Sequence, residues 1–168
     1  MKTIELTQGK MAMVDDEDFE WLNQFKWHAA QRSGGLIYAQ GQVDGKHQLM
    51  HRVIMTTKSG QEIDHINGDG LDNRRDNMRV CSHQQNLANS KISKTNKSGY
   101  KGVHLMKVSH NSPRPWRAQI LVDGEIISLG SFSSPVEAAI AHDLAAIEFN
   151  GLFARLNFPK EVYHLYFF

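Results

Sequence analysis

A chain of 168 residues, 40% hydrophobic and 22% charged, is long enough for one ordinary domain or two small ones. Its single cysteine, Cys81, excludes an internal disulfide framework and any zinc site that is built on several thiolates. No apolar run approaches the length of a transmembrane helix, and the N-terminus lacks the apolar core of a signal peptide. We therefore expect a cytoplasmic protein without a membrane partner.

The formal net charge is only +1, but the charges are unevenly distributed along the chain. Residues 1–63 carry 7 basic and 8 acidic side chains, whereas residues 74–117 carry 10 basic side chains and one acidic, Asp76. A local excess of nine positive charges is typical of contact with a nucleic acid backbone. A solvated basic linker is the alternative, although the excess also spans segments that are predicted to fold.

Residues 1–55 are predicted to be mostly β-structure, with strands at residues 2–6, 10–14, 27–32, 36–43 and 46–49. The acidic run at residues 15–18 supplies an N-cap and first turn for a helix at residues 17–25, which is commoner than metal binding by such a run. Residues 50–55 begin a short helix or strand. We interpret this part as a β-rich support that has no chemistry of its own.

Residues 62–90 hold the densest set of side chains with chemical potential. An apolar residue leads into the adjacent pair Asp64-His65, and a loop rich in Asn, Gly and Asp follows, which can satisfy its own backbone. A short extended piece precedes Ser82, which stands three residues before Gln85 in a capping box that starts a helix. Two short strands and a helix therefore bring together a carboxylate, an imidazole and an amide. This set suits one hard divalent ion with a base beside it.

These residues, in this order and spacing, resemble the HNH nuclease family, the ββα-metal fold, in its homing-endonuclease branch. The resemblance covers about 30 residues closely and rests on Asp64-His65-Ile66-Asn67-Gly68, Leu71-Asp72-Asn73-Arg74, Asn77 and Gln85-Asn86. It implies a metal-dependent endonuclease that acts on double-stranded DNA in a bacterial or phage-infected cell.

The resemblance also implies a role for each site residue. His65 is the general base, and the usual histidine pKa of about 6.5 suits proton abstraction from water. Because it is adjacent to Asp64 on an extended segment, His65 is expected to point to the other side of the strand. Asp64 and Asn86 are the implied ligands, and one carboxylate with one amide oxygen suits Mg²⁺ or Mn²⁺ better than Zn²⁺. Asn77 is implied to pin the loop and to orient the base.

The sequence leaves open what several further residues do. His83, one helical turn before the second implied ligand, could bind a phosphate, protonate the leaving group or add a third ligand. It could equally be an exposed residue at the helix N-terminus. Arg52, Arg74 and Arg79 could clamp phosphate, and a surface salt bridge is the alternative for each. His51 is expected to be a packing residue.

The second half of the chain begins with residues 91–99, which are polar and basic and indicate a linker or an arm along a phosphate backbone. Strands are expected at residues 101–106, 116–122 and 125–129, with a hairpin turn at Asp123-Gly124. Ser134-Pro135 then marks the start of a helix that runs to about residue 149. The predicted unit is a three-stranded antiparallel sheet with one helix behind it.

This unit resembles the Apetala-type domain, the DNA-binding domain of plant ethylene-response factors, over about 60 residues. The resemblance rests on Tyr100-Lys101-Gly102-Val103, Trp116-Arg117-Ala118-Gln119-Ile120, Leu129-Gly130-Ser131-Phe132, Glu137-Ala138-Ala139, His142-Asp143, Ala145-Ala146-Ile147 and Leu156-Asn157-Phe158-Pro159. That family lays its sheet in the major groove of DNA. Carried over by position, the residues that would face DNA are Lys101, Gly102, His104, Arg117 and Gln119.

The chain departs from the plant domains at Leu121, Ile126 and Ser128, where arginine or tryptophan readers usually stand. The departure implies a grip that is dominated by contacts with the DNA backbone.

We therefore predict an α+β protein, with a β-rich HNH ββα-metal nuclease core followed by a three-stranded antiparallel sheet packed on one helix. The predicted divisions are a nuclease domain at 1–90, a basic linker at 91–99, an Apetala-type domain at 100–159 and a tail at 160–168. The predicted protein is a monomer or weak dimer that uses Mg²⁺ or Mn²⁺ and no small-molecule cofactor. The alternatives are a DNA-binding regulator with an inactive nuclease core and an RNA-directed protein, and the latter fits a sheet for the B-form groove less well.

Overall fold

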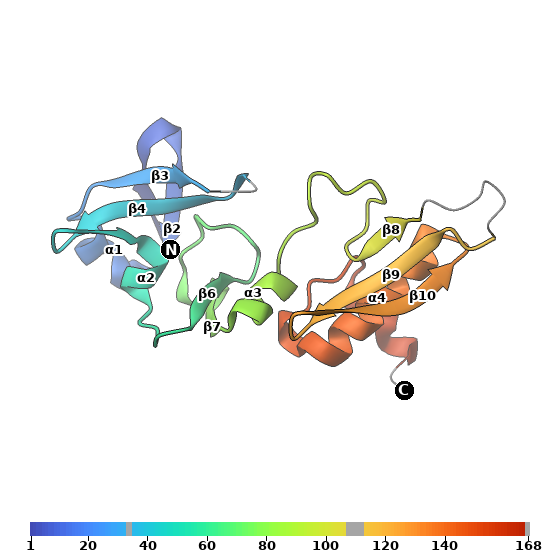
Figure 1. Cartoon of the computed structure of the whole chain (residues 1–168). Coiled ribbons are helices and arrows are strands. Elements are labelled where there is room, and N and C mark those ends of the chain that lie inside the picture. Colours follow the sequence, from blue (N-terminus) through green and yellow to red (C-terminus); the bar gives the residue numbers. More distant parts are fainter. Residues whose placement is uncertain (33–34, 107–112, 167–168) are drawn as a thin grey trace. The chain divides into compact units, whose positions relative to one another are not determined.

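The computed structural model describes residues 1–32, 35–106 and 113–166, and the chain divides into two compact units, Met1–Asn86 and Leu87–Phe168. Short helices and antiparallel sheets occur in both units, so the predicted α+β class is confirmed (Figure 1). Within the described residues, no helix combines the length and the apolar character that are needed to cross a membrane.

The first unit is built from small antiparallel sheets that are joined by short helices. Strand β1 (Lys2–Glu5) pairs with β2 (Met11–Val14), β4 (Ile37–Val43) lies between β3 (Trp27–Gln31) and β5 (Lys46–Leu49), and β6 (Glu62–His65) pairs with β7 (Met78–Cys81). The helices are α1 (Asp16–Leu22), α2 (Met50–Ile54) and α3 (His83–Ala88), the last of which continues into the second unit. The predicted strands of this half are therefore present, with small changes at their ends.

Helix α1 ends earlier than the predicted helix at residues 17–25. The carbonyl of Leu22 accepts a hydrogen bond from the indole of Trp27 at 2.8 Å and another from the backbone N–H of Phe25 at 3.1 Å. In a longer helix the Leu22 carbonyl would accept a hydrogen bond from a later residue of the same helix. Here these two donors satisfy it instead. The chain therefore turns here, and the Phe25 and Trp27 rings meet edge to face at 6.3 Å.

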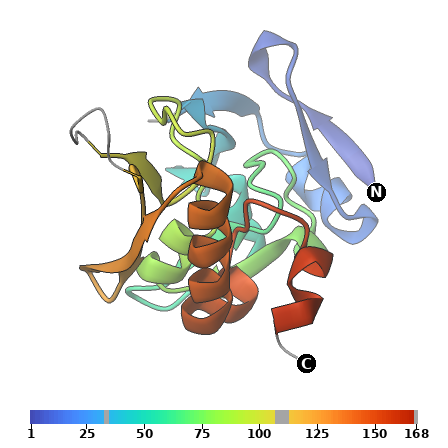
Figure 2. The same ribbon diagram turned by 90° about the vertical axis from the view of Figure 1, so that its right-hand side faces the viewer.

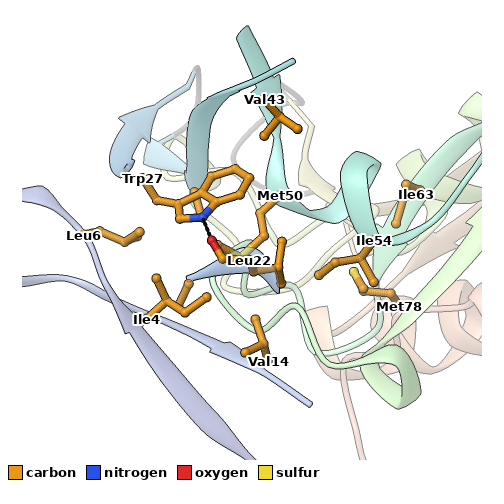
Figure 3. Packing of buried hydrophobic residues seen from close by; sticks show 12 residues of the cluster. Ile4, Leu6, Val14, Leu22, Trp27, Val43, Met50, Ile54, Ile63 and Met78 are labelled. Atoms are coloured by element: carbon orange, nitrogen blue, oxygen red, sulfur yellow. Dashed lines mark hydrogen bonds between the residues drawn. The ribbon is translucent and has the colours of Figure 1, made fainter. Parts of the chain in front are cut away.

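A common hydrophobic core ties these small sheets together (Figure 3). The hairpin β1–β2 contributes Ile4 and Val14, and α1 contributes Leu22, all of which are buried. At the other side of the cluster, Ile63 of β6 and Met78 of β7 are buried in the same core. Burial of one such side chain contributes about 1.5 to 3 kcal/mol to stability. The strands that carry the implied site are thus anchored by the N-terminal elements.

The loop between β6 and β7 is also bonded directly to the N-terminal elements. The backbone N–H of Met13 donates to the carbonyl of Leu71 at 2.8 Å, and the N–H of Asn73 donates to the carbonyl of Met13 at 2.8 Å. Asp18 of α1 is buried and binds the Arg75 guanidinium through two hydrogen bonds of 2.7 and 2.8 Å. The acidic run thus begins a helix, as predicted, and additionally holds the loop.

In the second unit, the predicted sheet and helix are both present. Strand β9 (Trp116–Val122) lies between β8 (Val103–Leu105) and β10 (Glu125–Phe132), and α4 (Pro135–Asn150) covers one face of the sheet (Figure 2). Small buried side chains, Ala118 of β9 with Ala138 and Ala139 of α4, allow the close approach of helix and sheet. The opposite face of the sheet remains uncovered by α4.

The basic segment at residues 91–99, expected as a linker or arm, is partly folded back on itself. The Asn96 side chain accepts hydrogen bonds from the backbone N–H groups of Ser98 and Gly99, both at 2.9 Å, and donates to the carbonyl of Tyr100 at 2.9 Å. These bonds form a compact turn that leads directly into the sheet.

A buried carboxylate joins α4 to the C-terminal part of the chain. Asp143 is fully buried and accepts hydrogen bonds from the backbone N–H of Asn157 at 2.6 Å, the N–H of Phe158 at 3.1 Å and the hydroxyl of Tyr163 at 2.5 Å. Because Tyr163 is itself buried, the 3-10 helix at Lys160–Tyr166 lies beside α4 (Figure 2).

The close approach at Gly102 gives a stability test. Gly102 has a φ of +73°, and a Cβ at this position would lie 1.9 Å from Cδ2 of the buried His142. We expect Gly102→Ala to lower the free energy of unfolding by about 3 to 5 kcal/mol, because left-handed strain and overpacking add together. Gly124→Ala is the control, since its φ is +82° and a Cβ there would have no atom within 4 Å. It should cost only about 1 to 2 kcal/mol in the same denaturant titration, and equal costs would contradict the packing argument.

Candidate active site

Strand β6 distributes the candidate side chains over two faces. Glu62 and Asp64 share one face, and Ile63 and His65 share the other, because side chains alternate along a strand. The register with β7 places Arg79 opposite Asp64 and Met78 opposite His65. Asp64 and His65 therefore point to opposite sides of the sheet, as the sequence predicted.

Asp64 is held by Arg79. The carboxylate is only 4% exposed, and its Oδ2 accepts hydrogen bonds from Nε of Arg79 at 2.8 Å and from Nη2 at 2.7 Å. Both nitrogens approach the same oxygen. Arg79 was expected to contact phosphate or to form a salt bridge. In the structure it forms a salt bridge with Asp64, the implied metal ligand.

Helix α3 contacts the same face of β6 through Glu62. The Asn86 amide Nδ2 donates to Oε2 of Glu62 at 2.6 Å, and Nδ1 of His83 lies 2.8 Å from Oε1. These hydrogen bonds, that from Asn86 foremost, lower the pKa of Glu62 below its usual value. His83 is the exposed first residue of the helix, whose predicted capping box is formed by Ser82 and Gln85. Sequence reasoning missed Glu62, although its position two residues before Asp64 places it on the same face.

His65 is oriented by Asn73. The imidazole is 5% exposed, and its Nε2 lies 3.4 Å from Oδ1 of Asn73. The Asn73 amide donates through Nδ2 to the carbonyl of Leu71 at 3.2 Å, so its oxygen faces the ring. Nε2 of His65 is therefore the donor and Nδ1 the basic nitrogen. Burial lowers the pKa of His65 below its usual value, and the Asn73 hydrogen bond partly offsets that shift, which favours the neutral form of a base.

His51 packs against this base, as expected from the sequence. It is buried, with its ring 5.1 Å from that of His65 and 5.4 Å from that of Tyr38, both edge to face. Burial lowers the pKa of His51 to about 3, and its Nδ1 has no hydrogen-bond partner within the described part of the chain. His51 is thus an uncharged side chain that packs against the His65 ring.

Asn77 holds the loop that carries these groups. Its side chain accepts from the backbone N–H of Asn67 at 3.1 Å and donates to the carbonyl of Asp72 at 2.8 Å. The buried Asp72 carboxylate in turn binds Arg74 through hydrogen bonds of 2.6 and 2.7 Å. Arg74, expected to clamp phosphate or form a salt bridge, is therefore found in a salt bridge, whereas Arg52 lies exposed on α2.

The residues expected to face DNA from the second unit fall into two groups. His104 and Arg117 pair across β8 and β9, and with Gln119 they lie on the sheet face opposite the buried Ala118. Gly102 instead packs closely against the side chain of His142.

Lys101 forms part of the packing of the second unit. Its ammonium donates to the carbonyls of Ala88 and Ser90, and burial lowers its pKa to about 8. The structure thus places His104, Arg117 and Gln119 together on the uncovered face and gives Lys101 and Gly102 structural contacts.

The donor set fits a hard divalent ion. Asp64 would supply a carboxylate, and Asn86 would supply an amide oxygen, because its nitrogen is directed to Glu62. Burial raises the pKa of Cys81 to about 11, so that its thiol stays protonated and is a poor ligand. In the part of the chain that the structure describes, no three His, Cys, Asp or Glu side chains gather as a metal cage. Few protein ligands and several waters are typical of Mg²⁺ sites and not of closed zinc sites.

Comparison with known proteins finds similarity over the same segment of the chain. Residues 48–88, which span α2, β6, β7 and α3, match the HNH endonuclease family. An "Uncharacterized HNH endonuclease L560" of Acanthamoeba polyphaga mimivirus is 27% identical over 152 residues, which cover 89% of this chain and 76% of the viral protein. "Protein 3.8" of Escherichia phage T7 is 35% identical over 66 residues, which cover 39% of this chain and 51% of the phage protein.

The chain therefore contains an HNH endonuclease domain and is a DNA nuclease, a hydrolase of phosphodiester bonds. HNH nucleases generally use a divalent metal ion.

The hydrogen bonds of Asn77 predict a measurable loss of stability. We expect Asn77→Ala to lower the free energy of unfolding by about 2 to 3 kcal/mol, because the substitution leaves the backbone carbonyl of the buried Asp72 without its partner and also removes the hydrogen bond from the backbone N–H of Asn67. Denaturant titration of the full chain measures this cost. Asn23→Ala, at the exposed end of α1, is the control and should change the free energy by less than about 0.5 kcal/mol. An equally small cost for Asn77→Ala would show that its side chain does not hold the loop.

Proposed function

We propose that this nuclease is a metal-dependent endonuclease that nicks or cleaves double-stranded DNA, and that it acts as a homing endonuclease in the cytoplasm of a bacterial or phage-infected cell. Asp64 and Asn86 are the proposed ligands of Mg²⁺ or Mn²⁺, and His65 is the proposed base. One observation carries the proposal. The buried His65, held by Asn73, stands on the same strand as Asp64 within the segment that matches the HNH family.

The chain's own groups supply the proton transfer of the hydrolysis. Nδ1 of His65 accepts a proton from the attacking water, while Nε2 remains bonded to Asn73 and fixes the ring. Packing of His51 and Tyr38 against the ring keeps it in one orientation. A bound divalent ion would neutralise the charge that develops on the phosphate and the leaving oxygen. A monomer with one such site nicks one strand, so a double-strand break requires a dimer or two visits.

The second unit is proposed to supply affinity and register on the DNA as an Apetala-type module. Its uncovered sheet face presents Arg117, His104 and Gln119, groups that can hydrogen-bond to phosphates or base edges. Leu121 and Ile126 pair across β9 and β10 on the same face and are 43% and 66% exposed. Apolar side chains in the major groove contact thymine methyl groups. A small ββα core reads little sequence, which is why target choice is assigned to this unit.

A DNA-binding regulator with an inactive nuclease core is the second candidate. The ion pair between Asp64 and Arg79 favours it, because a guanidinium at the carboxylate competes with a metal ion. Incubation of supercoiled plasmid with Mg²⁺ or Mn²⁺ separates the two functions. Nicked product supports the endonuclease, whereas a gel shift without cleavage under either ion supports the regulator.

Loss of the proposed base should separate cleavage from binding. We expect His65→Ala to lower the nicking rate by about 100-fold or more while DNA affinity stays within about twofold, because a general base contributes to chemistry and not to binding. Rates on supercoiled plasmid and affinities from gel shifts measure the two quantities. His47→Ala removes an exposed histidine of β5 and is the control. Equal nicking by His65→Ala and the control would remove His65 from its role.

Loss of Arg117 should weaken DNA binding with a recognisable salt dependence. We expect Arg117→Ala to weaken binding about tenfold at low salt and to reduce the slope of log affinity against log salt by about one, as for one lost phosphate contact. Lys160→Ala removes the same charge from the exposed C-terminal 3-10 helix and is the control. If both variants weaken binding equally, the uncovered sheet face is not the DNA-binding surface.

A further inference from the structure

Glu62 occupies an unusual position between two polar groups of α3. Its Oε2 accepts the hydrogen bond from Nδ2 of Asn86 at 2.6 Å, and its Oε1 lies 2.8 Å from Nδ1 of His83. The Glu62 side chain is 30% exposed, so water competes only partly for these contacts. Both oxygens of a single carboxylate are therefore engaged by the helix that carries an implied metal ligand.

The contact with Glu62 determines which way the Asn86 amide points. An ionised carboxylate only accepts hydrogen bonds, so the amide can face it only through its nitrogen. The amide oxygen is then directed away from Glu62. A free asparagine rotates its amide by 180° at little energetic cost and would present either atom to a cation. Only the oxygen can coordinate a hard divalent ion.

We propose that Glu62 is a positioning residue, which fixes the Asn86 amide so that its oxygen is available to the divalent ion. This inference rests on the proposed function, since it assigns a role toward the ion that Asp64 and Asn86 would hold. Such partners of a ligand commonly raise metal affinity about 10- to 100-fold.

Two other roles for Glu62 explain the contacts less well. As a direct ligand it would have to bind the ion beside hydrogen bonds that already engage both of its oxygens, and no three acidic, histidine or cysteine side chains gather in the described residues. As a mere anchor for α3 it would duplicate the capping box, in which Ser82 and Gln85 exchange hydrogen bonds of 2.8 and 3.2 Å.

A double-mutant cycle with Asn86→Asp tests the orientation directly. Aspartate has two equivalent oxygens, so a ligand at position 86 no longer needs an orienting partner once it is a carboxylate. Mn²⁺ binding to the full chain without DNA, followed by the electron paramagnetic resonance signal of free Mn²⁺, gives a readout that is independent of cleavage. The five proteins are the wild type, Glu62→Ala, Glu62→Gln, Asn86→Asp and the double variant Glu62→Ala/Asn86→Asp.

The proposal expects Glu62→Ala to weaken Mn²⁺ binding about tenfold when residue 86 is asparagine. In the Asn86→Asp background the same change should weaken binding clearly less, because only the loss of one nearby negative charge then acts on the cation. Glu62→Gln should fall between wild type and Glu62→Ala, because its oxygen can still accept from Asn86. Glu20→Ala removes another carboxylate, which binds Lys2 on the surface, and is the control.

Equal losses from Glu62→Ala in both backgrounds would overturn the proposal and leave Glu62 as an anchor of the helix. Unchanged binding by Glu62→Ala alone would also overturn it. A failure of the proposed function looks different, because the wild type itself would then neither bind Mn²⁺ nor nick DNA. Circular dichroism of each variant shows whether the fold is intact, and Glu62→Gln carries the argument if Glu62→Ala unfolds.

Discussion

The candidate active site depends on two hydrogen bonds between the edge of β2 and the loop that joins β6 to β7. Met13 bonds through its N–H to Leu71 and through its carbonyl to Asn73, and Asn73 in turn orients His65. A single residue, Asn73, therefore connects the N-terminal hairpin to His65, the implied base. The buried Asp18, which pairs with the exposed Arg75, reinforces the same connection. An ion pair with one exposed partner gains little net stability, so its main effect here is to fix the position of the loop.

Local patterns predicted much of this architecture. Strand alternation separated Asp64 from His65, and the capping residues placed the starts of α3 and α4 within one residue. The contacts that complete the site join residues far apart in the sequence, and no local pattern contains them. Asp15 shows the difference, because it stands at the N-cap of α1 as expected, yet its side chain accepts from the backbone N–H of Arg75, 60 residues away.

The basic side chains between residues 74 and 117 fall into two groups, those bonded within the fold and those exposed to solvent, which the sequence could not distinguish. Several of these side chains are committed to internal partners, namely Arg74 to Asp72, Arg75 to Asp18, Arg79 to Asp64 and Lys101 to backbone carbonyls. Their charge is neutralised or their donors are occupied within the fold. Among the described residues of this stretch, the exposed basic side chains outside these pairs are Lys91, Lys94, Lys97, Arg114 and Arg117. A count of charges thus overstates the surface that can meet a phosphate backbone.

The buried carboxylate of Asp143 has a consequence for anyone who wishes to transplant the second unit onto another enzyme. A graft that stops at Pro159, where the proposed Apetala-type module ends, would discard the Tyr163 hydroxyl, which is one of the donors to this buried carboxylate. At the other end, the graft must start early enough to keep the Ala88 and Ser90 carbonyls that receive the Lys101 ammonium. The smallest portable segment is therefore longer on both sides than the recognisable motif.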